Sequence, residues 1–136
     1  MENCVFCKIV NGELPSFKIY EDKFTFAFLD NSGDFYGHIL IVPKKHYENV
    51  FDCSKTMLGH LMNATKKICN HLVNECGFSG VNILNSNGKS AEQTVFHLHI
   101  HLIPRMENDN FKIFPAGNKN SKNLDFSIIQ NKLKLQ

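Results

Sequence analysis

The chain has 136 residues and a formal net charge of +2, with 43% hydrophobic and 21% charged residues. This size and balance are typical of one globular domain and exclude two ordinary ones. The weak charge, without a run of Lys and Arg, argues against nucleic acid as a partner. The longest apolar stretches, such as residues 39–42, have the length of a strand, so no membrane span is expected.

The cysteines indicate the compartment. Five is an odd number, so a complete disulfide framework is not expected. The start, Met-Glu-Asn-Cys, lacks the charged-then-apolar order of a secretory signal. Both observations favour reduced thiols and a cytoplasmic location.

The first part of the chain predicts short elements. Residues 4–10 predict a helix that Asn11-Gly12 ends. Two strands are expected next, at residues 17–20 and 23–29, with a turn at Glu21-Asp22 between them. A loop at residues 31–37 then leads to a strand at residues 38–42, which Pro43 stops.

The hydrophobic period changes to that of a helix over residues 54–76, with Ser54 as the N-cap and Gly77 as the stop. After this helix, the pattern predicts a strand at 81–84, a polar loop at 85–91 and a strand at 94–103 that Pro104 ends. A polar loop at 108–123 and an amphipathic helix at 124–133 are expected to follow. Strands on both sides of one long helix predict an α+β fold: a mostly antiparallel sheet, one long helix and a C-terminal helix.

Residues 96–103, Phe-His-Leu-His-Ile-His-Leu-Ile, carry the strongest chemical signal. Because side chains alternate between the faces of a strand, the aliphatic residues share one face and the three histidines share the other. Histidines spaced by about 6.7 Å converge poorly on one zinc ion, whose bonds are about 2.0–2.1 Å long. Attack on phosphorus by one ring, with its neighbours binding the phosphate, fits better. Purely structural histidines are the alternative, but each buried without a partner costs about 1–3 kcal/mol.

This segment resembles the histidine-triad (HIT) superfamily, whose motif is His-x-His-x-His followed by two apolar residues. The match is residues 97–103, and it extends further. Residues 37–46 resemble the strand that brings a fourth active-site histidine, residues 93–96 the phosphate-binding approach, and residues 28–30 the ribose-binding strand end. The resemblance covers residues 3–105 and implies one HIT-like domain over residues 1–136, with residues 106–136 as an extension.

The resemblance implies a nucleophile at the middle histidine, His99, which attacks the α-phosphorus of a nucleotide. A nucleotidyl-histidine forms, and water then cleaves it. The attacking nitrogen must be unprotonated, so we expect the other ring nitrogen of His99 to donate to a backbone carbonyl. The resemblance completes the catalytic set with residues that orient the nucleophile or bind the phosphate: His38, His97, His101 and Thr94.

The resemblance also implies where the nucleotide binds. Asp30 resembles the carboxylate that accepts both ribose hydroxyls, with turn capping as the alternative. Asn85, Gln93 and Thr94 resemble contacts near the phosphate. The expected base pocket, for which plain core packing is the alternative, consists of Val5, Phe6, Ile9 and Phe28.

Two residues depart from the family pattern. Asn31 stands where relatives often carry an apolar residue, which bears on the contacts of the base. Glu92 stands where many relatives have Gly. A carboxylate beside a phosphate repels it unless the carboxylate points away or meets a Lys.

Cys4-Val5-Phe6-Cys7 forms a C-x-x-C pair, which can close a tetrahedral structural zinc site with two remote histidines. Certain histidine-triad proteins carry this pair with a histidine after Pro-Lys-Lys and the first triad histidine; the ligands here would be Cys4, Cys7, His46 and His97. The alternatives are two buried hydrophobic cysteines or a redox dithiol, although no predicted strand precedes the pair as redox motifs usually require. The chemistry at His99 needs no metal.

Within the superfamily, the sequence most resembles the Hint-like nucleoside phosphoramidases, which release AMP or GMP from 5'-phosphoramidates. A dinucleoside polyphosphate hydrolase is the alternative, and a nucleotide-binding module without turnover is another. The family usually forms a two-fold homodimer, and here the long helix and residues 81–84 would supply the contact.

Overall fold

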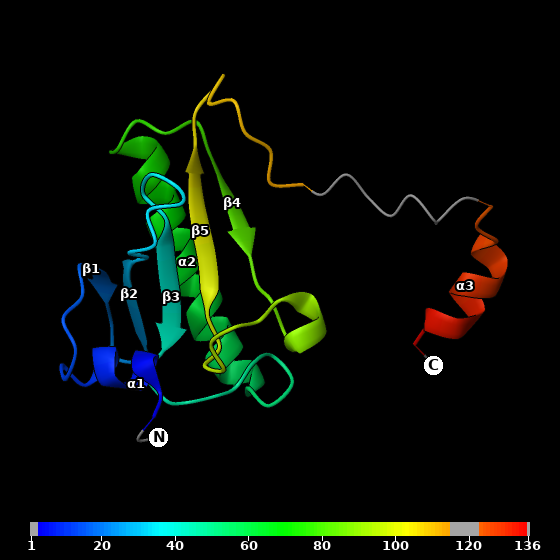
Figure 1. Cartoon of the computed structure of the whole chain (residues 1–136), viewed down its shortest axis with the longest axis horizontal. Coiled ribbons are helices and arrows are strands. Elements are labelled where there is room, and N and C mark those ends of the chain that lie inside the picture. The colour runs from blue at the N-terminus through cyan, green and yellow to red at the C-terminus, as the bar shows by residue number, and fades with distance from the viewer. Residues whose placement is uncertain (1–2, 115–122, 136) are drawn as a thin grey trace.

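The computed structural model describes residues 3–114 and 123–135. It has one antiparallel sheet in the order β1-β2-β3-β5-β4, and the long helix α2 lies across one face (Figure 1). The strands are β1 (Lys18–Glu21), β2 (Thr25–Leu29), β3 (Ile39–Pro43), β4 (Gly80–Leu84) and β5 (Ile100–Arg105). The helices are α1 (Val5–Val10), α2 (Lys55–Asn74), the 3-10 helix η1 (Lys89–Ala91) and α3 (Phe126–Leu133). The predicted α+β fold is confirmed.

Helix α2 begins and ends where the sequence predicts. The Ser54 hydroxyl accepts a hydrogen bond from the Met57 N–H at 3.1 Å, as an N-cap does. Gly77 follows the helix with a φ of +84°, which glycine adopts without steric cost. The buried side of α2 is formed by Leu61, Ala64, Thr65, Ile68 and Leu72.

The two faces of the sheet pack against different helices. Ile39 and Ile41 of β3 lie in the core against α2, whereas Leu40 and Val42 lie in a second cluster with Phe6 of α1. Leu40 pairs with His101 of β5, so the histidine lies on the α1 face. This second face therefore carries the apolar cluster and a catalytic candidate together.

The predicted strand at residues 94–103 is displaced. Strand β5 begins only at Ile100, so His97 and His99 lie before it, in a segment that bends at residues 95–97. Other bonds hold that segment: the Leu98 N–H donates to the Tyr47 carbonyl at 2.7 Å, outside any strand ladder. The strand also continues through Pro104 to Arg105. Proline has no N–H to donate, but the pairing of β5 with β3 ends at Leu102, so Pro104 lies beyond that pairing. The prediction that the aliphatic residues of this segment are buried is confirmed for Leu98, Ile100 and Leu102.

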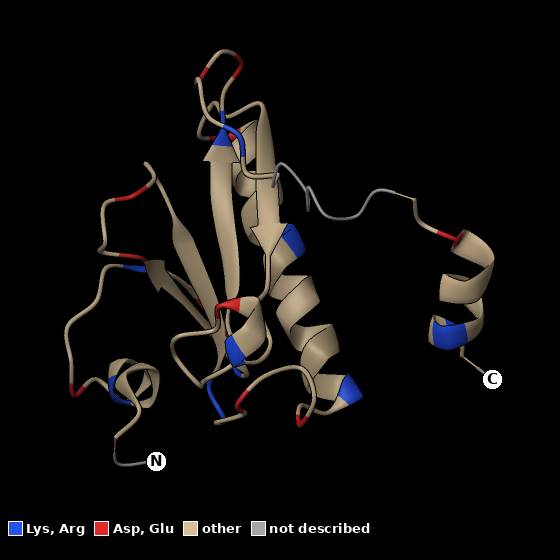
Figure 2. Cartoon of the chain, turned by 45° about the vertical axis from the view of Figure 1, so that its right-hand side comes forward, with Lys and Arg blue, Asp and Glu red and all other residues tan. Residues whose placement is uncertain are grey.

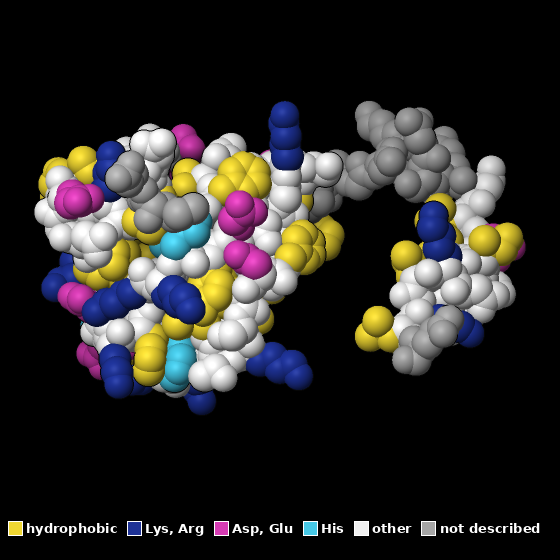
Figure 3. All heavy atoms as spheres, turned by 90° about the horizontal axis from the view of Figure 1, so that it is seen from below, with side chains coloured by type: hydrophobic (Ala, Val, Ile, Leu, Met, Phe, Trp, Pro, Cys, Tyr) yellow, Lys and Arg dark blue, Asp and Glu magenta, His cyan; other side chains and the backbone are white. Residues whose placement is uncertain are grey.

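The remaining differences lie at the surface. Helix η1 forms inside the predicted polar loop at 85–91, and α3 starts two residues later than predicted because Asp125 caps it. Helix α3 lies apart from the sheet (Figure 1), with hydrophobic side chains at its surface (Figure 3). Residues 115–122 of the predicted loop at 108–123 lie outside the described residues. None of the described helices combines the length and the apolar character needed to cross a membrane.

Candidate active site

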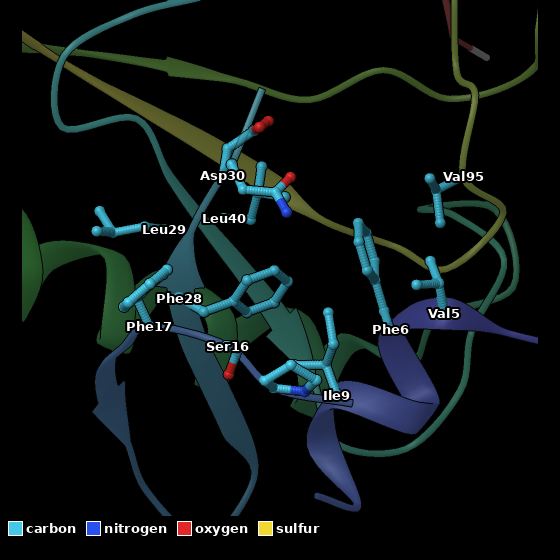
Figure 4. A pocket seen from close by; sticks show the side chains of 12 residues that line it. Val5, Phe6, Ile9, Ser16, Phe17, Phe28, Leu29, Asp30, Leu40 and Val95 are labelled. Carbon is cyan, nitrogen blue, oxygen red and sulfur yellow. The ribbon is translucent and has the colours of Figure 1, made fainter. Parts of the chain in front are cut away.

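A cavity of about 500 Å³ lies between α1, the end of β2 and the segment before the triad (Figure 4). All five residues predicted for the base and the ribose line it: Val5, Phe6, Ile9, Phe28 and Asp30. Phe6 and Phe28 also pack in the second core cluster, so the core-packing alternative holds for both side chains. Asn31, which the sequence analysis connected with the base, lines the cavity too. The sequence did not assign a base or ribose contact to the rest of the lining, which consists of Pro15, Ser16, Phe17, Leu29, Leu40 and Val95.

His99 lies beside this cavity with a defined tautomer. Its ring packs edge-on against Phe6, at 5.2 Å between centroids, and Phe6 lines the cavity. The His99 Nδ1 lies 2.7 Å from the His97 carbonyl oxygen. Because a carbonyl only accepts, Nδ1 carries the proton and Nε2 keeps its lone pair. This is the arrangement expected of an attacking imidazole.

His38, His101 and Asp30 form a row next to His99, in which the two histidines are hydrogen-bonded and the Asp30 carboxylate faces His38. The His38 Nε2 lies 2.8 Å from the His101 Nδ1, and its Nδ1 lies 3.4 Å from an Asp30 carboxylate oxygen. The carboxylate favours a proton on the facing His38 Nδ1. The row thus links a carboxylate at the cavity wall to the His101 imidazole, whose centroid lies 4.8 Å from that of His99.

Burial keeps these rings neutral. Desolvation lowers the pKa of His99 and lowers the pKa of His101 to about 4, with the nearby His99 and His38 rings adding to the shift of His101. Desolvation also lowers the pKa of His38, although the Asp30 carboxylate opposes it. A bound phosphate supplies the negative charge that favours protonation of a neighbouring ring.

Asp30 caps a turn, which is one of the two alternatives considered from its sequence, and it also lines the cavity. One carboxylate oxygen accepts a hydrogen bond from the Ser32 N–H at 2.7 Å, which caps the turn, while the other faces His38. Burial raises the pKa of Asp30, but the hydrogen bonds from Ser32 outweigh it and lower the pKa on balance. The side chain is therefore an ionised acceptor at the cavity wall.

Asn85 lies behind the nucleophile. Its amide donates to the His99 carbonyl at 2.9 Å, and its own oxygen accepts from the Asn87 amide. The Asn87 oxygen in turn accepts from the Val50 N–H at 2.8 Å. Asn85 is thus placed to position the backbone of His99, and sequence reasoning missed the role of Asn87 because no motif contains it.

The Gln93 side chain joins the two loops that flank the triad. Its amide donates to the carbonyls of Glu48 (2.7 Å) and Val95 (3.0 Å), and its oxygen accepts from the Gly88 N–H (2.8 Å) and the Asn49 amide (3.3 Å). The Gln93 N–H donates to the Gly88 carbonyl. These bonds engage both polar atoms of its side chain and its backbone N–H, and Gln93 is almost completely buried, with 4% exposed.

Replacing Gln93 by leucine is expected to lower the free energy of unfolding by about 2–4 kcal/mol, because four buried hydrogen bonds lose a partner. Urea unfolding followed by circular dichroism measures the change. Gln130→Leu on exposed α3 is the control and should shift stability little. Equal stability of the two variants would contradict the assignment of Gln93 as the link between the loops.

Thr94 lies in a second hollow of about 580 Å³ next to the cavity. Within the described residues, neither its hydroxyl nor its N–H forms a hydrogen bond. Both groups are therefore free for a phosphate oxygen. The hollow is lined by Asn3, Cys4, Val5, His46, Glu48, Thr94, Val95 and Phe96.

The four residues predicted to bind zinc converge on one point. The His97 Nε2 donates to the Pro43 carbonyl at 2.9 Å, so its Nδ1 is unprotonated. That Nδ1 lies 3.3 Å from the Cys4 Sγ, 3.5 Å from the Cys7 Sγ and 3.2 Å from the His46 Nδ1. Tetrahedral bonds of about 2.0–2.3 Å separate ligand atoms by about 3.3–3.8 Å. The two sulfur and two nitrogen atoms therefore fit a zinc ion.

A model of the HIT domain family matches residues 11–108. The chain belongs to the HIT family. This confirms the family predicted from the histidine segment. An uncharacterized HIT-like protein of Borreliella burgdorferi is 44% identical over 121 residues, which cover 88% of this chain and 86% of that protein.

Two further relatives of this HIT protein carry informative descriptions. The adenosine 5'-monophosphoramidase HNT1 of Saccharomyces cerevisiae is 39% identical over 104 residues, covering 76% of this chain and 63% of the yeast protein. A zinc-bound histidine triad family protein from Mycobacterium smegmatis has a crystal structure with a TM-score of 0.78 and 32% identity, covering 86% of this chain and 85% of that one. The relatives thus include a named hydrolase and a metal-bound structure.

Proposed function

We propose that this HIT protein hydrolyses nucleoside 5'-phosphoramidates at the α-phosphorus, releasing a purine nucleoside monophosphate and an amine. The observation that carries the proposal is the His99 ring, whose Nδ1 is bound to a carbonyl and whose Nε2 lone pair is free. The adjacent cavity combines apolar walls with the Asp30 carboxylate, as a nucleoside requires. The relative HNT1 supports the choice of a phosphorus–nitrogen bond.

The reaction proceeds in two displacements. The His99 Nε2 forms a bond to phosphorus while the phosphorus–nitrogen bond breaks and the leaving nitrogen takes up a proton. Water then attacks phosphorus, the bond to Nε2 breaks, and the water loses a proton. One proton is taken up and one released, so atoms and charge balance.

The surrounding groups stabilise the charge that develops on the phosphate oxygens. His101 lies beside His99, and a proton on its outer nitrogen is supported through His38 by the Asp30 carboxylate. The free hydroxyl and N–H of Thr94 donate to a phosphate oxygen. Donors that the folded chain holds in fixed positions stabilise this charge without reorganising during the reaction.

Replacing Asp30 by asparagine is expected to reduce kcat/KM about 10- to 100-fold on ribonucleotide substrates, because a charged acceptor of the ribose hydroxyls is lost. Steady-state kinetics on matched ribo- and 2'-deoxyribo-adenosine phosphoramidates measure the effect. The wild type should prefer the ribose form and the variant should lose that preference. Asp52→Asn, at an exposed loop, is the control. A variant that keeps the full preference would remove Asp30 from ribose binding.

The experiment that tests the proposed function compares two substrates for the same nucleophile. Adenosine 5'-phosphoramidate and diadenosine triphosphate are incubated with the full chain, and AMP release is followed by chromatography. We expect faster release from the amidate. Faster release from the diadenosine compound would favour a dinucleoside polyphosphate hydrolase. Nucleotide binding without AMP release from either substrate would favour a nucleotide-binding module without turnover.

Zinc is proposed as a structural ion held by Cys4, Cys7, His46 and His97, where it joins the start of α1 to the segment before β5. The ion takes no part in the two displacements. The five cysteines form no disulfide, and thiolate ligands need a reducing compartment, which favours the cytoplasm.

A homodimer is proposed through β4 and the outer side of α2. Strand β4 is an edge of the sheet, and edge strands are exposed to pairing with another chain. Ile83 of β4 is 47% exposed and Met62 of α2 is 52% exposed, so apolar surface is available for such a contact.

A further inference from the structure

The segment after β5, residues 106–111, lies at the end of the sheet where the loop at residues 31–37 also lies. Strand β5 ends at Arg105, and β3 begins directly after the loop and His38. Because β3 and β5 are antiparallel, the loop before one and the segment after the other meet at the same end of the sheet (Figure 1). The proposed reaction assigns no part to residues 106–111, which we call the strap.

Arg105 holds the strap in place. Its Nε and one of its Nη atoms each lie 2.8 Å from a different oxygen of Asp109, and its other Nη donates to the Asn82 side-chain oxygen of β4 at 2.8 Å. Basic and acidic positions accordingly lie together at this end of the sheet (Figure 2). The guanidinium also donates to the Phe111 carbonyl, and its carbon lies 4.0 Å from the centre of the Phe111 ring. Bidentate charged pairs and cation–π contacts give such a link both strength and direction.

The turn that brings Asp109 back to Arg105 is formed by the strap itself. Asn108 and Asn110 each have a φ of +64°, in the left-handed region, which asparagine adopts more readily than most residues. The Met106 carbonyl accepts from the Asp109 N–H at 3.3 Å, and the Met106 N–H donates to the Asp109 carboxylate at 3.1 Å. The hydrogen bonds from Arg105 hold the pKa of Asp109 well below its usual value, so the pair stays charged. The strap therefore has a defined conformation.

Three rings in contact connect the strap to the catalytic histidines. Phe111 of the strap packs against Phe35 of the loop at 5.2 Å between centroids, and Phe35 packs edge-on against His38 at 5.8 Å. Phe35 and Phe111 are half-buried, whereas the residue on either side of each is exposed. The two phenylalanines thus shield each other at a surface that is otherwise open to water, and their packing reaches the imidazole.

The orientation of the His38 ring decides whether its two partners are aligned. Its Nε2 lies 2.8 Å from the His101 Nδ1, and its Nδ1 faces the Asp30 carboxylate at 3.4 Å. Within the described part of the chain, this Nδ1 forms no hydrogen bond, so only Nε2 anchors the ring by a bond. Packing has to fix the plane of the ring, and the edge contact with Phe35 does so. Misplacement of a catalytic group by about 1 Å can cost about 10²-fold in rate.

On the basis of the proposed phosphoramidase function, we propose that Arg105 and Phe111 are positioning residues for that reaction. The strap holds Phe35 against His38 and so keeps the His38 ring aligned with both of its partners. Neither Arg105 nor Phe111 lines the nucleoside cavity, so both act through Phe35. The bonds made and broken are those of the two displacements at the nucleophile.

Removal of the Phe111 ring tests the inference. We expect Phe111→Ala to lower kcat on adenosine 5'-phosphoramidate about three- to tenfold, because the His38 ring is no longer held in one orientation. Phe111→Tyr keeps the ring and should keep the rate. Phe114→Ala, at a phenylalanine of the same segment that is 90% exposed, is the matched control. Wild-type turnover in Phe111→Ala overturns the inference.

A double variant separates positioning from a general structural effect. Phe35→Ala should lower kcat by a similar factor, and Phe35→Ala/Phe111→Ala should lower it no further, because both rings act through one contact. Arg105→Lys keeps the charge but loses the fork that binds the strap, so kcat should fall about three- to tenfold as well. Additive losses in the double variant, or an unchanged rate in Arg105→Lys, overturn the proposed route.

Proton NMR gives a readout that needs no turnover. With the His38 Nδ1 protonated, the His101 Nδ1–H donates to the His38 Nε2, and its proton should be protected from exchange with water. We expect that proton to exchange at least about threefold faster in Phe111→Ala and at the wild-type rate in Phe111→Tyr. Equal exchange in all three proteins overturns the inference. A wild type that cleaves no amidate counts against the proposed function instead, and the exchange rates then decide the inference alone.

Discussion

Glycine in place of His99 is expected to reduce turnover of adenosine phosphoramidate by roughly 10³-fold or more, because the atom that bonds to phosphorus is lost. The His99 Nε2 is the free nitrogen of a ring whose Nδ1 is bound at 2.7 Å to a carbonyl. His97 has its free Nδ1 directed at the cysteines. His101 also has a bonded Nδ1, but its partner is the His38 ring, and of these two rings it is His99 that packs against Phe6 of the cavity wall. The loss should therefore appear almost entirely in kcat.

Three measurements separate this role from a structural one. Steady-state release of AMP gives the loss of turnover, and calorimetry with AMP should show binding retained, because the cavity residues are unchanged. Rapid quenching of the wild type, followed by intact mass spectrometry, should detect a nucleotidyl adduct that the variant lacks. His71→Gly, at an exposed position near the end of α2, is the matched control. A glycine variant with wild-type turnover, or an adduct on another histidine, would exclude His99 as the nucleophile.

The sequence predicted the parts of the fold that depend on local periodicity. The apolar repeat between Ser54 and Gly77 has a helical period and clear end signals, so α2 formed within those limits. The sheet alternation also placed the buried aliphatic residues of β5 correctly. Each of these features depends on neighbours along the chain, which a single sequence contains.

The prediction failed where distant bonds replace local ones. The triad segment reads as a strand from Thr94, yet the Leu98 N–H bonds to Tyr47, and the other bonds, to Asn85 and Pro43, involve side chains instead of a backbone ladder. No periodicity reveals such partners. The same limit explains the cavity: Pro15, Ser16 and Phe17 belong to the connection before β1 and meet the base pocket only after folding.

The family resemblance identified residues better than it identified their contacts. It brought Gln93 and Asn85 to the site, but their amides bind the protein and position the loops and the nucleophile. Asp30 caps the turn with one carboxylate oxygen, and the other oxygen faces His38. Roles of this kind depend on which hydrogen bonds are already made, and only the folded structure shows that.

Removal of zinc is expected to have the largest effect on stability. Two thiol sulfurs and two imidazole nitrogens surround one point, and the His97 Nδ1 lies within 3.5 Å of each of the other three. Without an ion, the lone pair of that nitrogen faces a second imidazole and two thiols, which are weak donors. Coordination satisfies all four groups at once and ties α1 to the sheet, so its free energy adds directly to folding. Metal-replete protein should contain one zinc per chain by elemental analysis.

Cys7→Ser should lower the free energy of unfolding by about 4 kcal/mol or more, as loss of a metal site commonly does, and a strong chelator should have a similar effect on the wild type. Chemical unfolding with and without added zinc measures both. Cys76→Ser, at an exposed thiol, is the control and should keep the metal and the stability. Because no step of the reaction uses the ion, the metal-free protein should still form the nucleotidyl adduct at temperatures where it remains folded. Full stability in Cys7→Ser would exclude a structural metal, and loss of the adduct in folded, metal-free protein would assign the ion a part in catalysis.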